Sequence, residues 1–106
     1  MIIRGGENIP VAYVENVLYE HPDVAAVAVV GLPDPRLQER ACAVVVLKSE
    51  VAQDPGQAFT MDDMRAFLTE KGVARQYWPE RLELLPELPR TASGKIRKFE
   101  LRDMLR

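Results

Sequence analysis

The sequence predicts an α+β domain in which a small mixed sheet of about three strands is packed with helices. Two continuous apolar runs rich in β-branched residues, 24–30 and 41–47, are typical of strands buried on both faces. Two other segments, residues 10–20 and 60–71, carry apolar residues at helical spacing. At 106 residues the chain has the length of one domain and can bury a core of its own.

The first elements along the chain are a strand, a turn and a helix. Residues 1–4 predict a short strand that leads into a turn at Gly5 and Gly6. Pro10 suits the first turn of a helix, because its missing N–H would have no partner there. We expect this helix to end near His21, which precedes a proline. Its apolar face consists of Val11, Val14, Val17 and Leu18.

The middle of the chain predicts two buried strands and a second helix. Residues 31–35 contain a glycine and two prolines, so we expect a loop between the strands. A surface turn is expected at 53–56. Thr60 can cap a helix that has Asp63 in its first turn and ends at Gly72. The apolar face of that helix consists of Met61, Met64, Phe67 and Leu68.

The last elements are a third strand and a short helix. The strand covers residues 81–85 and is entered through Pro79, and the helix lies around residues 99–105. Trp78, which precedes Pro79, is expected to anchor its loop to the core. A place on an interdomain surface is the alternative for this side chain.

Composition excludes several classes of protein. The apolar share of 47% and the charged share of 28% are ordinary for a soluble globular domain. The apolar runs are too short to span a membrane, and no signal peptide opens the chain. The single cysteine, Cys42, cannot form an internal disulfide and is expected in the core. With one histidine, His21, and no clustered carboxylates, the sequence predicts no metal site. A cytoplasmic location fits these features.

The charge is distributed unevenly along the chain. Residues 89–106 carry six lysines and arginines against two acidic residues, a net charge of +4; because the whole chain has −2, the remainder has −6. A basic tail on an acidic body favours a local anionic partner over a nucleic-acid surface, since no aromatic residues alternate with the cations. The alternative is a helix with cations near its C-terminal end. That alternative accounts for Arg102 and Arg106, but Lys95 precedes the helix.

The most informative segment is the loop before the last helix. Thr91, Ser93 and Gly94 favour a turn, and Gly94 frees the backbone directly before Lys95. The ammonium group of Lys95 is therefore presented from a loop tip. Its natural partner is a phosphate or a developing oxyanion. The alternative is a solvated turn, because most lysines have no other role.

Two motifs place the chain in a known superfamily by resemblance. The string PRTASGKIRK at residues 89–98 resembles the C-terminal lysine motif of the adenylate-forming enzymes, which include acyl-CoA synthetases, peptide-synthetase adenylation domains and luciferases. The string IIRGGENIP at residues 2–10, followed by Val14 and Glu15, resembles the glycine-turn motif that opens their small C-terminal domain. Within the second string, the residues RGGENI are most similar to those of acyl-CoA ligases. The resemblance covers essentially the whole chain.

The resemblance implies a reaction in two steps. The parent enzyme activates a carboxylic acid with ATP to an acyl-adenylate, and then transfers the acyl group to coenzyme A. Lys95 is implied to be catalytic, because it matches the lysine that bridges the carboxylate and the α-phosphate as the adenylate forms. Thr91, Ser93 and Gly94 are implied to support its loop.

The glycine turn is implied to serve the second step. Arg4, Gly5 and Gly6 match the loop that lines the channel for the pantetheine arm of CoA, after the domain rotates about a hinge. Many relatives carry a lysine at the position of Gly5, so any contact there would come from the backbone. Residues 34–40 match a loop that contacts the large domain or the nucleotide end of CoA, although Gln38 replaces a glycine of the pattern. Plain surface is the alternative for that segment.

The sequence contains no glycine-rich phosphate loop and no set of magnesium carboxylates. In the family, ATP and Mg²⁺ are bound mainly by a larger N-terminal domain. We therefore expect residues 1–106 to be a single C-terminal domain of an acyl-CoA synthetase, inactive when isolated, whose partner is its own large domain. The alternative is a non-catalytic interaction module that retains the fold. The sequence leaves open which acid is activated, and whether the acceptor is CoA or a carrier-protein thiol.

Overall fold

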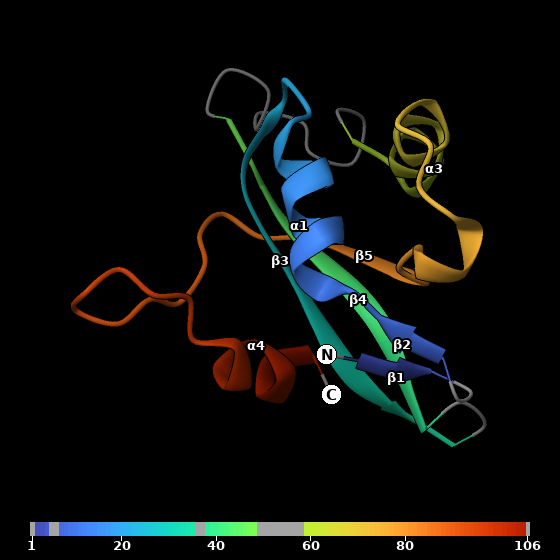
Figure 1. Cartoon of the computed structure of the whole chain (residues 1–106). Coiled ribbons are helices and arrows are strands. Elements are labelled where there is room, and N and C mark those ends of the chain that lie inside the picture. The colour runs from blue at the N-terminus through green and yellow to red at the C-terminus, as the bar shows by residue number, and fades with distance from the viewer. Residues whose placement is uncertain (1, 5–6, 36–37, 49–58, 106) are drawn as a thin grey trace.

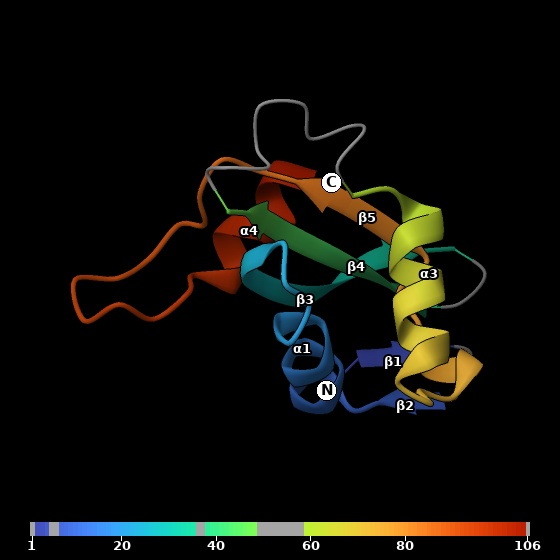
Figure 2. The same ribbon diagram turned by 90° about the horizontal axis from the view of Figure 1, so that it is seen from above.

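A mixed sheet lies between helices on both of its faces, as two views of the computed structural model show (Figure 1, Figure 2). The structure describes residues 2–4, 7–35, 38–48 and 59–105. Helices α1 and α3 cover one face of the sheet and α4 covers the other. The predicted α+β class is therefore confirmed. The strands are β1 (Ile2–Arg4), β2 (Glu7–Ile9), β3 (Val24–Asp34), β4 (Gln38–Leu47) and β5 (Arg81–Leu84), and the helices are α1 (Val11–Tyr19), α3 (Met61–Glu70), the 3₁₀ helix η1 (Arg75–Tyr77) and α4 (Lys98–Leu105).

The hairpin of β3 and β4 forms the centre of the sheet. The two strands pair antiparallel from Val24 and Leu47 to Asp34 and Gln38. The loop predicted at residues 31–35 is therefore wrong for most of its length, because β3 continues as a strand to Asp34. Cross-strand pairing overrides the local preference of the prolines here. Since β3 lies at the edge of the sheet, Pro33 loses no hydrogen bond that an inner strand would need.

Strand β4 also pairs with the rest of the sheet. It runs parallel to β5, from Cys42 beside Arg81 to Val45 beside Leu84, and meets β1 where Arg4 pairs with Gln38. Strands β1 and β2 form a short antiparallel hairpin of their own. The sequence predicted β1 but not β2. The expected turn residues Gly5 and Gly6, and the turn expected at 53–56, lie outside the described residues.

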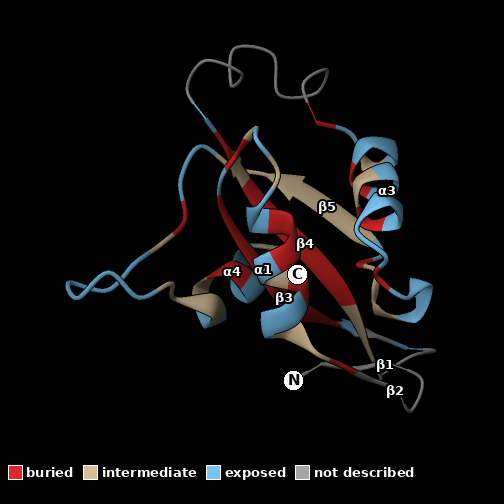
Figure 3. Cartoon of the chain, turned by 45° about the horizontal axis from the view of Figure 1, so that its top comes forward, coloured by how far each residue is buried: buried red, intermediate tan, exposed pale blue. Residues whose placement is uncertain are grey.

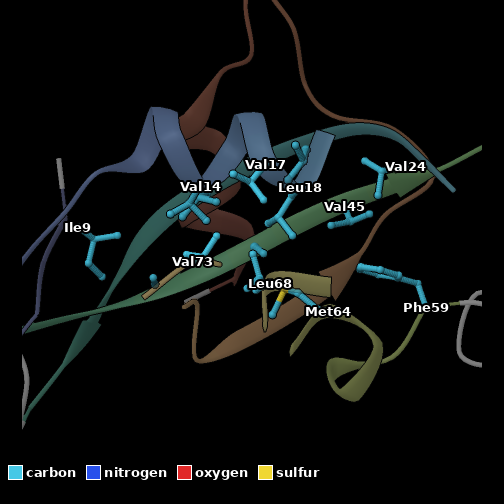
Figure 4. Close-up of a cluster of buried hydrophobic side chains, with 14 of the residues drawn as sticks. Ile9, Val14, Val17, Leu18, Val24, Val45, Phe59, Met64, Leu68 and Val73 are labelled. Carbon is cyan, nitrogen blue, oxygen red and sulfur yellow. The ribbon is translucent and has the colours of Figure 1, made fainter. Parts of the chain in front are cut away.

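Two apolar clusters explain why the strand segments are continuously apolar. Alternate residues of β3 and β4, such as Val29 and Val45, face α1 and α3, whereas their neighbours, such as Val30 and Val44, face α4. A sheet covered on both faces needs apolar side chains at every position, as the buried colouring of these strands shows (Figure 3). Figure 4 shows the first cluster, which includes Val14, Leu18, Phe59, Met64 and Leu68.

Helix α3 begins and ends as its sequence signals predict, whereas Pro10, predicted in the first turn of α1, lies just before that helix. The Thr60 hydroxyl accepts a hydrogen bond from the Asp63 N–H at 3.1 Å, and the Asp63 carboxylate accepts one from the Thr60 N–H at 2.9 Å. This reciprocal capping satisfies two N–H groups that a helix start leaves unpaired. Gly72, just beyond α3, has a φ of +74°, a conformation that favours glycine. Trp78 is the loop anchor that was predicted, because its indole N–H donates to the Val73 carbonyl at 2.9 Å.

The described part of the chain has features of neither a membrane-spanning segment nor a metal site. No helix there is long and apolar enough to cross a membrane. No group of three or more histidine, cysteine, aspartate or glutamate residues in that part is arranged to hold a metal ion.

Candidate functional site: the Lys95 loop

The Lys95 loop, residues 89–97, has its base fixed against the domain. Leu88, directly before it, is 6% exposed and belongs to the cluster under α4, against which Ile96 also packs. The Arg97 N–H donates to the Pro89 carbonyl at 2.8 Å, and Arg90 and Ile96 form an antiparallel bridge. The two ends of the loop therefore lie side by side where the loop joins the rest of the domain.

The tip of the loop keeps its shape through hydrogen bonds of its own. The Thr91 N–H donates to the Lys95 carbonyl at 2.8 Å, and the Gly94 N–H donates to the Thr91 carbonyl at 2.9 Å. The Thr91 hydroxyl accepts from the Lys95 N–H at 3.2 Å and lies 3.0 Å from the Ser93 hydroxyl. Gly94 has a φ of +91°, which a residue with a Cβ adopts only at a cost. The predicted turn at Thr91, Ser93 and Gly94 is confirmed.

Lys95 lies at an exposed position beside this turn. Figures 1 and 2 both show the loop projecting away from the sheet and helices, and Figure 3 shows its tip as exposed. Among the described residues, no hydrogen bond or ion pair engages the Lys95 ammonium group. The charge of Lys95 is therefore available to a group outside this part of the chain.

The basic residues around Lys95 are engaged differently. Arg97 pairs with Glu100 at 3.1 Å and stacks over the Phe99 ring, and Lys98 pairs with Glu15 at 2.8 Å. Internal partners thus hold the two cations that follow Lys95 most closely. The basic tail is not a uniform surface for an anionic polymer.

A carboxylate that sequence reasoning did not single out connects this region to the sheet. One oxygen of Glu15, on α1, accepts hydrogen bonds from the Val29 N–H of β3 and from the Lys98 ammonium group, both at 2.8 Å. The two side chains come from the two motifs that carried the family resemblance. Their opposite charges were the available signal, but nothing in the sequence indicated that they meet.

The structure places Arg4, the described residue that precedes the glycine turn, away from the Lys95 loop. In the strand register, the backbone of Arg4 lies opposite Glu7 in the β1–β2 hairpin and opposite Gln38 at the start of β4. Figures 1 and 2 place this corner of the sheet on the opposite side of the molecule from the Lys95 loop. Instead, Arg4 lies beside Gln38, which also pairs with Asp34 at the end of the β3–β4 hairpin. Arg4, for which a CoA contact was predicted, thus meets the 34–40 segment, for which the large domain, CoA or plain surface was left open.

His21 and Cys42 both have structural surroundings. The His21 ring nitrogen Nδ1 accepts a hydrogen bond from the Asp23 N–H at 3.1 Å, and the ring contacts the edges of Phe59 and Phe67. Burial raises the pKa of the Cys42 thiol to about 11. The thiol is therefore protonated at neutral pH and is a poor nucleophile, in agreement with the core position predicted for it.

Comparison with known proteins identifies the family. Residues 13–95 match the AMP-binding enzyme C-terminal domain. The chain belongs to this family, which confirms the predicted resemblance.

Three relatives of the chain are named as a CoA ligase, a CoA synthase and a CoA synthetase, and they are much longer than this chain. The chain is 44% identical to the medium-chain fatty-acid–CoA ligase of Escherichia coli and 47% identical to a salicylyl-CoA synthase / salicylate adenylyltransferase of a Streptomyces species. Both alignments cover 100% of this chain and 18% of the relative. The structure of a Mycobacterium tuberculosis fatty acyl CoA synthetase matches with a TM-score of 0.83 and 34% identity, over 98% of this chain and 19% of the other. The chain thus spans about a fifth of the length of these relatives.

Proposed function

We propose that residues 1–106 are the mobile C-terminal domain of an ATP-dependent carboxylic acid–CoA ligase. The observation that carries the proposal is the Lys95 loop, which has a fixed base, a hydrogen-bonded tip and a lysine without a partner in the described part of the chain. The names and lengths of the relatives support it, because each aligns with this chain over one small part of a CoA ligase or synthase. The remaining part of the enzyme would be a large N-terminal domain.

In the first half-reaction, Lys95 would act on the transition state of adenylate formation. A carboxylate oxygen attacks the α-phosphorus of ATP, the bond to the β-phosphate oxygen breaks, and pyrophosphate leaves. Negative charge is then spread over the carboxylate and α-phosphate oxygens. An ammonium group between them lowers the barrier by electrostatic stabilisation and by holding the reacting groups together. We assign most contacts to ATP, and the Mg²⁺ ion, to the large domain.

In the second half-reaction, the opposite corner of this domain would face the active site. We propose that Arg4, Gly5 and Gly6 line the channel through which the thiol of CoA reaches the adenylate. The thiolate sulfur attacks the acyl carbon, and AMP leaves. The distance between this corner and the Lys95 loop supports the proposal, because one rigid domain presents two separate faces in turn by rotating about a hinge.

Mixing experiments with separately produced domains test this function. The isolated chain should show no acid-dependent exchange of pyrophosphate into ATP, because one loop lysine cannot orient a nucleotide without a pocket. Adding the separately produced large domain should restore the exchange, and a Lys95→Ala chain should fail to do so. A folded chain that restores nothing, although the large domain binds it, would support the interaction module instead. Exchange by the isolated chain would contradict the division of roles between the domains.

A further inference from the structure

The Glu15 carboxylate is fixed on two sides at the edge of strand β3. Its oxygen Oε2 accepts hydrogen bonds at 2.8 Å from the Val29 N–H and from the Lys98 ammonium group, and the Glu15 side chain is only 22% exposed. A hydrogen bond to the backbone of a strand gives the carboxylate a defined position. An ion pair with such a carboxylate is charge-assisted and directional, unlike a pair between two mobile surface side chains.

Lys98 is the first residue of α4 and follows Lys95 by only three positions. The ion pair with Glu15 therefore fixes the start of α4 at the point where the Lys95 loop ends. Helices α1 and α4 lie on opposite sides of β3, and the pair joins them across the edge of that strand (Figure 2). At the other end of α4, the Arg81 guanidinium donates to the Leu105 carbonyl at 3.1 Å.

The direction of the Lys95 loop depends on such contacts at its base. Within the described part of the chain, the hydrogen bonds of residues 91–95 are made to one another or to Arg90. They set the shape of the tip but not its orientation relative to the sheet. The orientation is set by the two chain segments at the base of the loop. The first follows buried Leu88, and the second continues into α4 at Lys98.

We propose that Glu15 and Lys98 are positioning residues that orient the Lys95 loop for adenylate formation. The proposal rests on the function proposed for Lys95. Neither residue needs to touch the substrate: the pair holds the first turn of α4 against α1 and β3, so that the Lys95 ammonium group reaches the α-phosphate at the correct angle. Small displacements of a positioned catalytic group reduce rates strongly.

The test compares the two half-reactions in the full-length ligase that carries this domain. Lys98→Met, which keeps the length of the side chain but removes its charge, should slow adenylate formation about tenfold, less than the ~10²-fold that a misplacement of about 1 Å can cause. The KM for ATP and the rate of transfer from preformed acyl-adenylate to CoA should stay nearly unchanged. Lys98→Arg should restore most of the lost rate, because a guanidinium group can also bind the Glu15 carboxylate.

Two further variants make the result specific. Glu15→Gln keeps an acceptor for the Val29 N–H but removes the charge that holds Lys98, so it should match the loss in Lys98→Met, and the double variant should lose no more than either. Lys71→Met is the matched control. It breaks the exposed 3.3 Å pair between Lys71 and Glu20, away from the loop, and should change neither half-reaction.

The outcomes separate this proposal from the function on which it rests. If Lys95→Ala leaves adenylate formation intact, the proposed function is wrong. If Lys95→Ala abolishes it but Lys98→Met and Glu15→Gln have no effect, only the positioning role is wrong. Equal losses in both half-reactions, or failure of both Lys98→Met and Glu15→Gln to fold, would show that the pair merely stabilises the fold and would overturn the proposal.

Discussion

The β3–β4 hairpin and the Lys95 loop are both antiparallel, but different forces stabilise them. Most of the described side chains of β3 and β4 are buried against helices on the two faces of the sheet, whereas residues 90–95 are all exposed. Side-chain packing stabilises the hairpin. Hydrogen bonds and the positive φ of Gly94 stabilise the turn of the Lys95 loop. A substitution in the hairpin therefore changes the stability of the whole domain. At the loop tip, a side chain can be replaced by one of different chemistry with little change in the stability of the domain.

The largest expected effect in the loop comes from Lys95→Ala. In the proposed full-length ligase, adenylate formation should fall by ~10²–10³-fold, as when one preorganised charge contact is removed from a transition state. Transfer from preformed acyl-adenylate to CoA, and the melting temperature, should hardly change, because the side chain is exposed. Rapid-quench assays of the two half-reactions would measure this. A lower melting temperature together with equal losses in both half-reactions would show that Lys95 contributes to the stability of the fold, as residues of the hairpin do.

The largest expected effect in the packed region comes from removing a buried side chain that lies between the sheet and α4. Leu101 is 0% exposed, and Leu101→Ala should lower the free energy of unfolding by about 3 kcal/mol through lost burial and the cavity left behind. Urea unfolding of the domain would measure it. Phe99→Ala, on the same helix but 56% exposed at Phe99, is the matched control and should cost less than about 1 kcal/mol.

A smaller effect on the loop is expected from Gly94→Ala. A Cβ at this position would meet no atom within 4 Å, so the cost comes from the φ of +91° alone. We expect a local penalty of about 1–2 kcal/mol, which shifts the turn away from the observed conformation. Adenylate formation should fall several-fold, and the free energy of unfolding should fall by no more than this penalty. If Gly94→Ala and Ser93→Ala had equal kinetic effects, the glycine conformation would not be what shapes the tip.

The smallest effect is expected from Thr60→Ala, at the start of α3. The substitution removes one half of the capping box and should lower the free energy of unfolding by about 1 kcal/mol. Neither half-reaction should change, since α3 lies on the face of the sheet opposite α4. Thermal unfolding followed by circular dichroism would measure the loss. Thr60→Ser, which keeps the hydroxyl, should restore most of it.

Local signals were sufficient to predict most of the elements from the sequence. The apolar spacing of α1 and α3 lies within the helices themselves, the cap of α3 directly precedes it, and the β-branched runs mark β3 and β4. The lysine turn was predictable for the same reason, because Thr91, Ser93 and Gly94 bond to residues a few positions away.

Pairing between distant residues was not predictable. The continuation of β3 to Asp34 depends on its partner strand, and two prolines locally indicated a loop. The Glu15 carboxylate binds residues from β3 and α4, far from it in sequence, so neither its position nor its role could be read from its neighbours. The functional assignments of Lys95, Arg4, Gly5 and Gly6 stay predictions, because they concern a substrate complex with another domain.

The hydrogen bond from the Val29 N–H to Glu15 also affects what the free edge of β3 offers to another strand. An edge strand such as β3 offers unpaired backbone N–H and C=O groups to which a strand of another molecule can add. Here a carboxylate already occupies the Val29 N–H, Lys98 places a second charge beside it, and Pro33 offers no N–H at all. A foreign strand would have to displace the carboxylate and bury both charges. In the folded domain, the contact that joins α1, β3 and α4 therefore makes the free edge of β3 a poor template for the addition of another strand.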